Sequence, residues 1–327
     1  MHPNHSAFPV QELCRLLNLA PLRIVDIGAG GENALDLMSI APLCEVHEVE
    51  PREQLDAEKK DIRGFGKYFR HKTALSDTCG PQNLFVTKIP EASSLLRPHL
   101  LNLKRWRGDD AGFEIVSEAT VHCETLGAFS TRINLNGCDL LKLDTQGSEL
   151  NILLSGIEFV CNTSIISIEV EFVRLYEGQY LFDDIVRELS NLGFRFVNFT
   201  HGQSLDGLDR GVAPQKRIWA DALFLRDSPG KISRDAALSA AIVLFQLGYD
   251  DEAIWYMKDH EISEGEIAIV ANAFRSSRAA NAAFLARVFI FPTIKALRNI
   301  KFPGRDIAIK AAKSVPWLNS IIRNLSY

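Results

Sequence analysis

Two stretches decide the fold of this chain: Val25-Asp26-Ile27-Gly28-Ala29-Gly30-Gly31 and, about 115 residues later, Leu141-Lys142-Leu143-Asp144-Thr145-Gln146-Gly147-Ser148-Glu149. Each is an apolar run that reaches a carboxylate and then glycine, a pattern typical of a strand that ends at a tight turn before a helix. Open α/β sheets bind ligands at the carboxyl ends of their strands. We therefore expect both stretches to lie at the ligand site of one nucleotide-binding sheet.

Outward from these stretches, the apolar periodicities of strands and helices alternate along the chain. They predict strands over residues 22–27, 44–50, 68–75, 139–144, 165–170, 194–199 and 219–225. They predict helices over residues 10–19, 33–40, 148–155 and 182–192. Residues 77–137 are mixed, with strand-like 85–86 and 113–116 and a turn into a short helix at 93–96. The alternation favours an α/β fold with a mainly parallel sheet that is covered on both faces.

The strand pattern ends near Ser233, and residues 236–257 predict a helical hairpin that packs on the α/β part. We therefore divide the chain into an α/β domain, residues 1–228, and a helical C-terminal extension, residues 229–327. The extension is strongly basic from Arg275 onward, with ten basic residues and one acidic residue, although the whole chain has a net charge of −5. Apolar residues interleave with these charges. This predicts either an amphipathic element on an anionic membrane or a packed helix with solvated charges.

The composition excludes several classes of protein. The 327 residues are 46% hydrophobic and 24% charged, as in an ordinary globular protein. No basic and apolar leader is present, and the longest apolar run, Ala236 to Phe245, is shorter than the roughly 20 residues of a membrane span. We expect a cytoplasmic protein, peripheral to the inner face of the membrane if the basic tail binds lipid. Nucleic acid is not an expected partner, because the α/β part is acidic and no binding motif is recognisable.

The six cysteines are scattered along the chain without any C-x-x-C pair. This spacing favours buried free thiols over disulfides or a zinc site.

Carboxylates and glycines gather at the first two predicted strand ends. Asp26 precedes the turn Gly28-Ala29-Gly30, where the backbone can pass under a ligand. Glu50 ends the second strand, where a carboxylate accepts hydrogen bonds from both hydroxyls of a ribose. A solvated loop acid and a structural glycine turn are the alternatives.

Four more acids lie at later strand ends. Asp144 ends one strand and Glu149 begins the helix after it. These two fit three roles: holding a cationic or amine-bearing group, binding a divalent metal, or capping the helix. Glu169 and Glu171 end the next strand on one face, so they are candidates for the same cleft.

Several segments together resemble the FkbM-type S-adenosylmethionine-dependent methyltransferases. They are Val25-Asp26-Ile27-Gly28-Ala29, Glu50-Pro51, Thr73-Ala74-Leu75-Ser76-Asp77, residues 142–150 and residues 168–176. The resemblance runs from about Leu22 to Arg226. It implies a Rossmann-like, doubly wound, mainly parallel seven-stranded methyltransferase sheet with a C-terminal helical extension, and S-adenosylmethionine as the cofactor.

The same resemblance implies roles for single residues. Asp26 and the Gly28-Ala29-Gly30 turn would hold the methionine end of the cofactor, Glu50 the ribose, and Ala74-Leu75 the adenine. Asp144 would face the sulfonium and the acceptor. Glu32 departs from the common pattern, which often has a third glycine there.

We therefore expect an O-methyltransferase that acts on a small-molecule, sugar or glycan hydroxyl. The base that removes the hydroxyl proton is expected among Asp144, Glu169 and Glu171, before the loop residues His122 and His201. We expect no metal, because no His, Asp or Glu spacing requires one.

A catalytically inactive scaffold that acts through its helical tail is the alternative function. A dehydrogenase is disfavoured because Gly28-Ala29-Gly30-Gly31-Glu32-Asn33 lacks the G-x-G-x-x-G spacing.

Overall fold

A computed structural model describes residues 13, 18–28, 35–51, 64–107, 111–200, 217–227 and 232–285. Most of the helix expected over 10–19 lies outside this part of the chain, as do Ala29, Gly30 and His201. The basic tail beyond Leu285 also lies outside it, so its two alternatives stay predictions.

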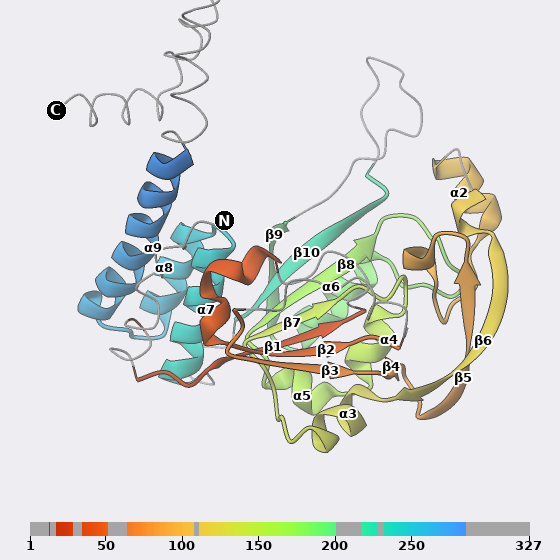
Figure 1. The fold of residues 1–327 in the computed structure, drawn as a ribbon, viewed down its shortest axis with the longest axis horizontal. Helices are drawn as coiled ribbons and strands as arrows, with labels where there is room; N and C mark the ends of the chain where they lie inside the picture. The colour runs from red at the N-terminus through yellow and green to blue at the C-terminus, as the bar shows by residue number, and fades with distance from the viewer. Residues whose placement is uncertain are drawn as a thin grey trace, which may run out of the picture. The chain divides into compact units, whose positions relative to one another are not determined.

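The main sheet has seven strands among the described residues, in the order β3-β2-β1-β7-β8-β10-β9 (Figure 1). They are β1 (Leu22–Ile27), β2 (Cys44–Val49), β3 (Lys67–His71), β7 (Leu140–Leu143), β8 (Ile165–Glu171), β9 (Phe194–Phe199) and β10 (Trp219–Arg226). Neighbouring strands are parallel except that β10 runs antiparallel to both β8 and β9. The mainly parallel sheet expected from the alternation is confirmed, as is the Rossmann-like form that the family resemblance implies.

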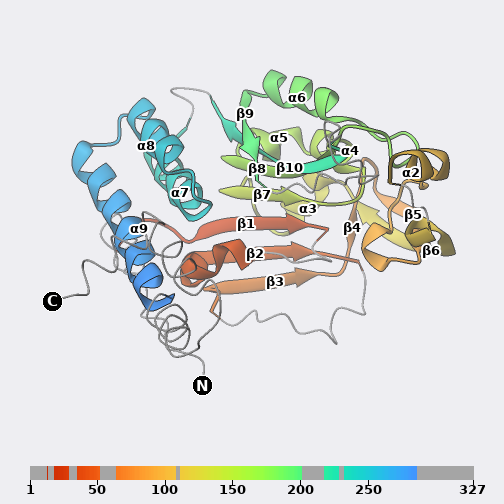
Figure 2. The same ribbon diagram turned by 90° about the horizontal axis from the view of Figure 1, so that it is seen from above.

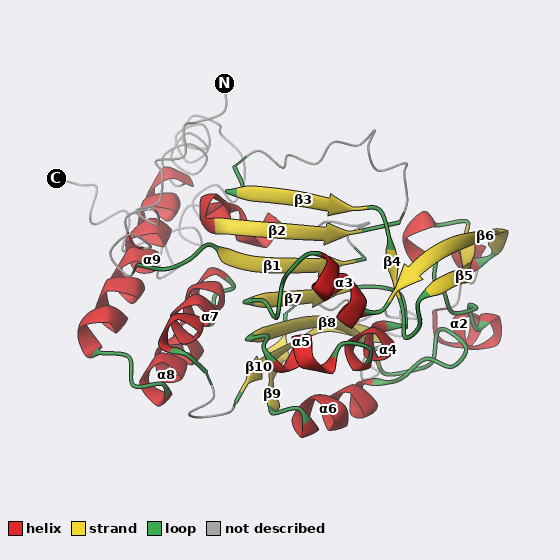
Figure 3. Ribbon diagram, turned by 90° about the horizontal axis from the view of Figure 1, so that it is seen from below, coloured by secondary structure: helices red, strands yellow, loops and turns green. Residues whose placement is uncertain are grey.

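Helices cover both faces of this sheet. On one face lie α3 (Leu126–Arg132), α4 (Glu149–Leu154), α5 (Ile157–Cys161) and α6 (Phe182–Asn191) (Figure 3). The 3₁₀ helix η1 (Leu35–Leu43) lies on the other face, against β2 (Figure 2). The helix expected over 33–40 is therefore present as a 3₁₀ helix with Pro42 inside it.

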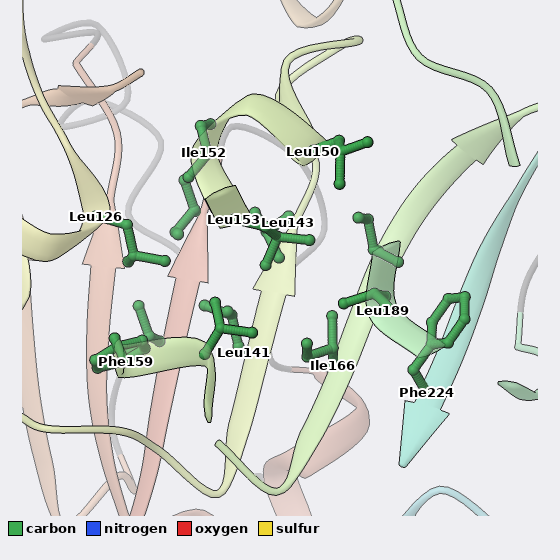
Figure 4. Packing of buried hydrophobic residues seen from close by; sticks show 14 of the residues in the cluster. Leu126, Leu141, Leu143, Leu150, Ile152, Leu153, Phe159, Ile166, Leu189 and Phe224 are labelled. Carbon is green, nitrogen blue, oxygen red and sulfur yellow. The ribbon is translucent and has the colours of Figure 1, made fainter. Parts of the chain in front are cut away.

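Alternate strand residues pack against α3 to α6 in one buried core. Figure 4 shows Leu141 and Ile166 of the sheet beside Leu153 and Phe159 of the helices. Because side chains alternate along a strand, the residues between these point to the opposite face. That places Asp26, Lys142 and Glu169 on one face of three adjacent strands. A slip of one residue would turn these charges into the core, so the apolar set fixes the register.

A second, three-stranded sheet has the order β4-β6-β5. It consists of β4 (Ala74–Leu75), β5 (Gly80–Thr87) and β6 (Ile115–Glu124). The prediction of one strand over 68–75 is wrong, because the chain leaves the main sheet after His71 and residues 74–75 pair with β6. Both segments are extended and partly apolar, so the sequence does not show the change of partner.

The connection from β5 to β6 carries η3 (Pro90–Ala92), α2 (Leu100–Arg107) and η4 (Ala111–Phe113). The short helix expected at 93–96 is absent. Instead, the backbone N–H groups of Phe85 and Ser94 donate to each other's carbonyl oxygens at 2.9 and 3.2 Å. These two hydrogen bonds occupy the backbone N–H and carbonyl of Ser94, which a helix over residues 93–96 would need.

The C-terminal part forms α7 (Arg234–Gln246), α8 (Asp250–Asp259) and α9 (Glu264–Leu285). Helices α7 and α8 form the expected hairpin. They belong to one compact unit, residues 10–267, while residues 1–9 and 268–327 form another. No helix in the described ranges is long and apolar enough to cross a membrane.

All five cysteines within the described residues are free, as expected. Three of them, Cys44, Cys123 and Cys138, are buried. The prediction of burial is wrong for Cys79 and Cys161, which are exposed.

Candidate active site

A pocket opens at the carboxyl ends of β1, β2 and β7, where the second sheet approaches them. It encloses about 780 Å³ of space free of protein atoms, part of it open to solvent. Its described lining comprises Ile27, Gly28, Val49, Glu50, Pro51, Thr73, Ala74, Leu75, Leu84, Glu91, Ser93, Ser94, Leu95, Asp144, Thr145, Gln146 and Ser148. Both stretches that decide the fold therefore reach one pocket.

Gly28 forms the floor of this pocket. Its φ of 82° lies in the left-handed region, and an added Cβ would lie 1.8 Å from the carbonyl oxygen of Asp144. Its N–H donates to the carbonyl of Val49 at 3.0 Å, and the N–H of Asp144 donates to the carbonyl of Ile27 at 3.0 Å. Only glycine fits here, and its small size lets the backbone approach a ligand closely.

Glu50 stands at the tip of β2 and is 4% exposed. Its N–H donates to the carbonyl of His71 at 3.1 Å, which fixes the strand end beside β3. Ala74 and Leu75 of β4 and Leu84 of β5 supply an apolar wall to the same pocket. A carboxylate and an apolar wall thus lie together, from segments that are distant in the sequence.

Asp26 does not line the pocket. It is buried, and its Oδ1 lies 3.5 Å from the Nζ of Lys142 on the neighbouring strand. Burial opposes the charge of Lys142, but Asp26, Asp144 and Asp221 outweigh it and raise the pKa of Lys142. The structure therefore places Asp26 outside the described pocket lining, paired with Lys142.

Of the three candidate bases, only Asp144 lines the pocket. Glu169 lies behind it, and burial, followed by the charge of Asp144, raises the pKa of Glu169 well above its ordinary value. Burial, followed by the charge of Glu149, does the same for the pKa of Glu171. The Oε2 of Glu171 and the Nε2 of Gln179 are buried without a hydrogen-bond partner in the described residues.

Glu149 closes the turn between β7 and α4. Its carboxylate accepts hydrogen bonds from the N–H of Thr145 at 2.7 Å and from the N–H of Gly147 at 3.0 and 3.1 Å. Burial raises the pKa of Glu149 despite these bonds. These bonds go to the turn before α4 and not to N–H groups of the helix, so the three roles expected for this acid stay predictions.

The histidines do not contribute to the pocket lining that is described. His122 is exposed on β6 and faces a separate hollow with Arg70 and Arg132. Within the described ranges, no group of three or more His, Cys, Asp or Glu residues is placed to hold a metal ion.

Gln146 and the loop after β5 were not expected in the site. Gln146 lines the pocket at a φ of 60°, and Glu91 and Ser94 line the same pocket from the loop after β5. The left-handed conformation of Gln146 has no signal in the sequence, because such positions usually carry glycine or asparagine. Glu91 and Ser94 fall in the mixed region 77–137, where no pattern indicated how the chain returns to the sheet.

A family model described as the methyltransferase FkbM domain matches residues 26–196, more than half of the chain. This chain belongs to the FkbM methyltransferase family. The resemblance inferred from the sequence is confirmed, and membership implies S-adenosylmethionine as the methyl donor.

Solved methyltransferase structures are similar to this FkbM chain only distantly. One is magnesium protoporphyrin IX methyltransferase from Synechocystis with bound S-adenosylmethionine, at 11% identity over 67% of this chain and 76% of that one, with a TM-score of 0.33. Another is a putative tRNA methyltransferase from Streptococcus pneumoniae in complex with S-adenosyl-L-methionine, at 9% identity over 81% and 97%, with a TM-score of 0.29. No curated protein matches the chain. The assignment rests on the match over residues 26–196.

The residues of the pocket fit this cofactor. Glu50 offers a buried carboxylate for the ribose hydroxyls, and Ala74, Leu75 and Leu84 offer an apolar surface for a flat base. Gly28 leaves the floor free of side-chain atoms. The carboxylate of Asp144 suits a positively charged sulfonium at the far end.

Proposed function

We propose that this FkbM methyltransferase transfers a methyl group to a hydroxyl of a sugar or glycan. The observation that carries the proposal is the position of Asp144. Asp144 lines the pocket that fits the cofactor, and the amide of Gln146 bridges its carboxyl group to that of Glu169. A carboxylate there can accept the proton that a hydroxyl must lose.

Different residues would bind the donor and accept the proton. When bound, S-adenosylmethionine supplies a methyl group on a positively charged sulfur. Glu50 and the apolar wall would orient the donor, and Asp144 would take the proton from the acceptor hydroxyl. The carbon–oxygen bond would form as the carbon–sulfur bond breaks, and the neutral thioether S-adenosylhomocysteine would leave. Alignment of donor and acceptor supplies much of the acceleration. General-base help adds about 10²–10⁴-fold.

The charge of the pocket supports a neutral acceptor. Its described lining contains three acids, Glu50, Glu91 and Asp144, and no lysine, arginine or histidine. Such a surface disfavours a phosphate or carboxylate near the reacting atoms. Neutral sugar hydroxyls fit this environment, and the resemblance noted from the sequence points to the same class.

Methyl transfer from labelled S-adenosylmethionine to a panel of neutral and acidic oligosaccharides tests the proposal, with Asp144→Asn as the inactive control. Transfer to neutral sugars that is lost in Asp144→Asn supports it. Transfer only to amines or to anionic acceptors contradicts it. Cofactor binding without transfer to any acceptor favours the inactive scaffold.

For the basic tail, we propose peripheral contact with an anionic membrane at the cytoplasmic face. Liposome sedimentation of the whole chain and of a chain that ends at residue 287 tests this. Binding to anionic vesicles that is lost on truncation supports it, and equal binding of both chains contradicts it.

A further inference from the structure

Gln146 stands at the tip of the turn between β7 and α4 in a conformation that few side chains adopt. Its φ is 60°, in the left-handed region, which is unfavourable for a residue with a Cβ. The neighbours on both sides, Thr145 and Gly147, are tied by their N–H groups to the carboxylate of Glu149. The turn therefore holds Gln146 in place against its own backbone preference.

The amide of Gln146 joins two carboxylates from neighbouring strands. Its Nε2 lies 2.9 Å from Oδ1 of Asp144 and 2.7 Å from Oε2 of Glu169. A primary amide has two N–H bonds, so it can donate one to each acid. Both donors are thus used to hold these two side chains in fixed positions.

The other side of Gln146 is also held. The hydroxyl of Ser94 donates to its backbone carbonyl at 2.8 Å, and the hydroxyl of Tyr176 lies 3.0 Å from its Oε1. If the amide were reversed, its oxygen would face two carboxylates. The contacts therefore fix which end of the amide faces the acids.

We propose that Gln146 is a positioning residue for methyl transfer, whose amide ties Asp144 to Glu169 and keeps the Asp144 carboxylate directed at the pocket. The inference rests on the proposed function. Asp144 touches the pocket, whereas Gln146 acts through it, by donating an N–H to the Oδ1 of Asp144 and so fixing where that carboxylate points.

The surrounding charges make this role necessary. The pair faces three more acids: Glu149 from α4, Glu171 on β8 and Asp221 from β10. On the other side, Lys142 of β7 is shared among Asp26, Asp144 and Asp221. The acids outnumber this lysine, so the N–H donors of Gln146 are needed to hold the Asp144 carboxylate in place beside them.

The consequence is a preference for the charged cofactor over its product. S-adenosylmethionine carries a sulfonium, and S-adenosylhomocysteine carries a neutral thioether in its place. A charged Asp144 attracts the first and not the second. The ratio of the dissociation constants of S-adenosylmethionine and S-adenosylhomocysteine therefore reports whether Gln146 holds the Asp144 carboxylate at the pocket.

Calorimetric titration of the full chain with both ligands, at about pH 6 and about pH 8, tests the inference. Gln146→Leu removes both donors. Gln146→Gly does the same but suits the left-handed backbone, so it separates the lost amide from misfolding. Gln82→Leu is the matched control, because the Gln82 amide bonds Ser76 and Thr78 and touches neither acid.

Both Gln146 variants are expected to lose the preference for S-adenosylmethionine by about tenfold, while Gln82→Leu keeps it. If Gln146→Gly has the wild-type ratio of dissociation constants at both pH values, the inference about Gln146 is overturned, but the proposed function is not. A wild-type chain that binds neither ligand overturns the proposed function and the inference with it.

Discussion

Gly28 and Asp144 meet backbone to backbone: a Cβ on the glycine would lie 1.8 Å from the carbonyl oxygen of the aspartate. The two stretches that begin and complete the site therefore touch at one point. Their contact fixes the position of Asp144 relative to the end of β1. The pocket therefore depends on residue 28 having no Cβ.

We expect Gly28→Ala to destabilise the chain by about 3 kcal/mol or more, because it adds a backbone clash to left-handed strain. The midpoint of urea unfolding measures this. Gly178→Ala is the control, because Gly178 also has a positive φ, of 74°, but nothing lies within 4 Å of an added Cβ. Gly178→Ala should lower the free energy of unfolding by only about 1 kcal/mol. Equal losses in both variants would show that the clash with Asp144 is absent.

The buried acids should make the chain less stable as the pH rises. Burial raises the pKa of Glu169 and of Glu171 well above the ordinary 4.5, so the folded chain holds protons that the unfolded chain has released. The contribution of these two acids to the free energy of unfolding is largest below about pH 4.5, and it is lost as the pH rises through their folded-state pKa. Urea unfolding from about pH 5 to pH 8 measures the slope.

Glu171→Gln should reduce that slope and add about 1 kcal/mol of stability at about pH 8, because an amide needs no proton to be neutral. Glu264→Gln serves as its control, since the side chain of Glu264 is 83% exposed. A slope that Glu171→Gln leaves unchanged would mean that Glu171 is not the group that holds the proton.

Tyr176→Phe should weaken the hold on Gln146 without removing it. The hydroxyl of Tyr176 is buried and lies 2.9 Å from the carbonyl of Ala92 as well as 3.0 Å from Gln146. We expect a loss of about 1 kcal/mol in stability and a smaller fall in the S-adenosylmethionine preference than in Gln146→Leu. Unfolding and calorimetry measure the two effects. Tyr180→Phe, at a side chain that is 40% exposed, should change neither.

The sheet was predictable because its strands carry strong local patterns. The apolar residues of β1, β7 and β8 alternate with polar ones at the strand ends, and glycine follows each of the first two. The second sheet was not predictable, since most residues of β6 are exposed on both sides and show no alternation. Ala74-Leu75 was recognised as part of the site only through the family resemblance, although it was assigned to the wrong sheet.

The site was predictable where a strand end and a residue type coincide, as at Gly28, Glu50 and Asp144. Asp26 and Lys142 show the limit of that reasoning, because a pairing between adjacent strands depends on register. Gln146 lies within residues 142–150, which carry the family resemblance, but its residue type alone predicts no role. Its function follows from contacts with Ser94, Glu169 and Tyr176, which are distant in the sequence.

Calorimetric titration of the whole chain with S-adenosylmethionine, in the wild type, Glu50→Ala and Glu118→Ala, tests the central claim most directly. We predict saturable binding to the wild type, weakened at least about tenfold in Glu50→Ala by the lost ribose hydrogen bonds. Glu118→Ala, at an exposed ion pair with Arg97, should bind as the wild type does. No binding to the wild type, or binding that Glu50→Ala leaves unchanged, would contradict the assignment of this pocket to the cofactor.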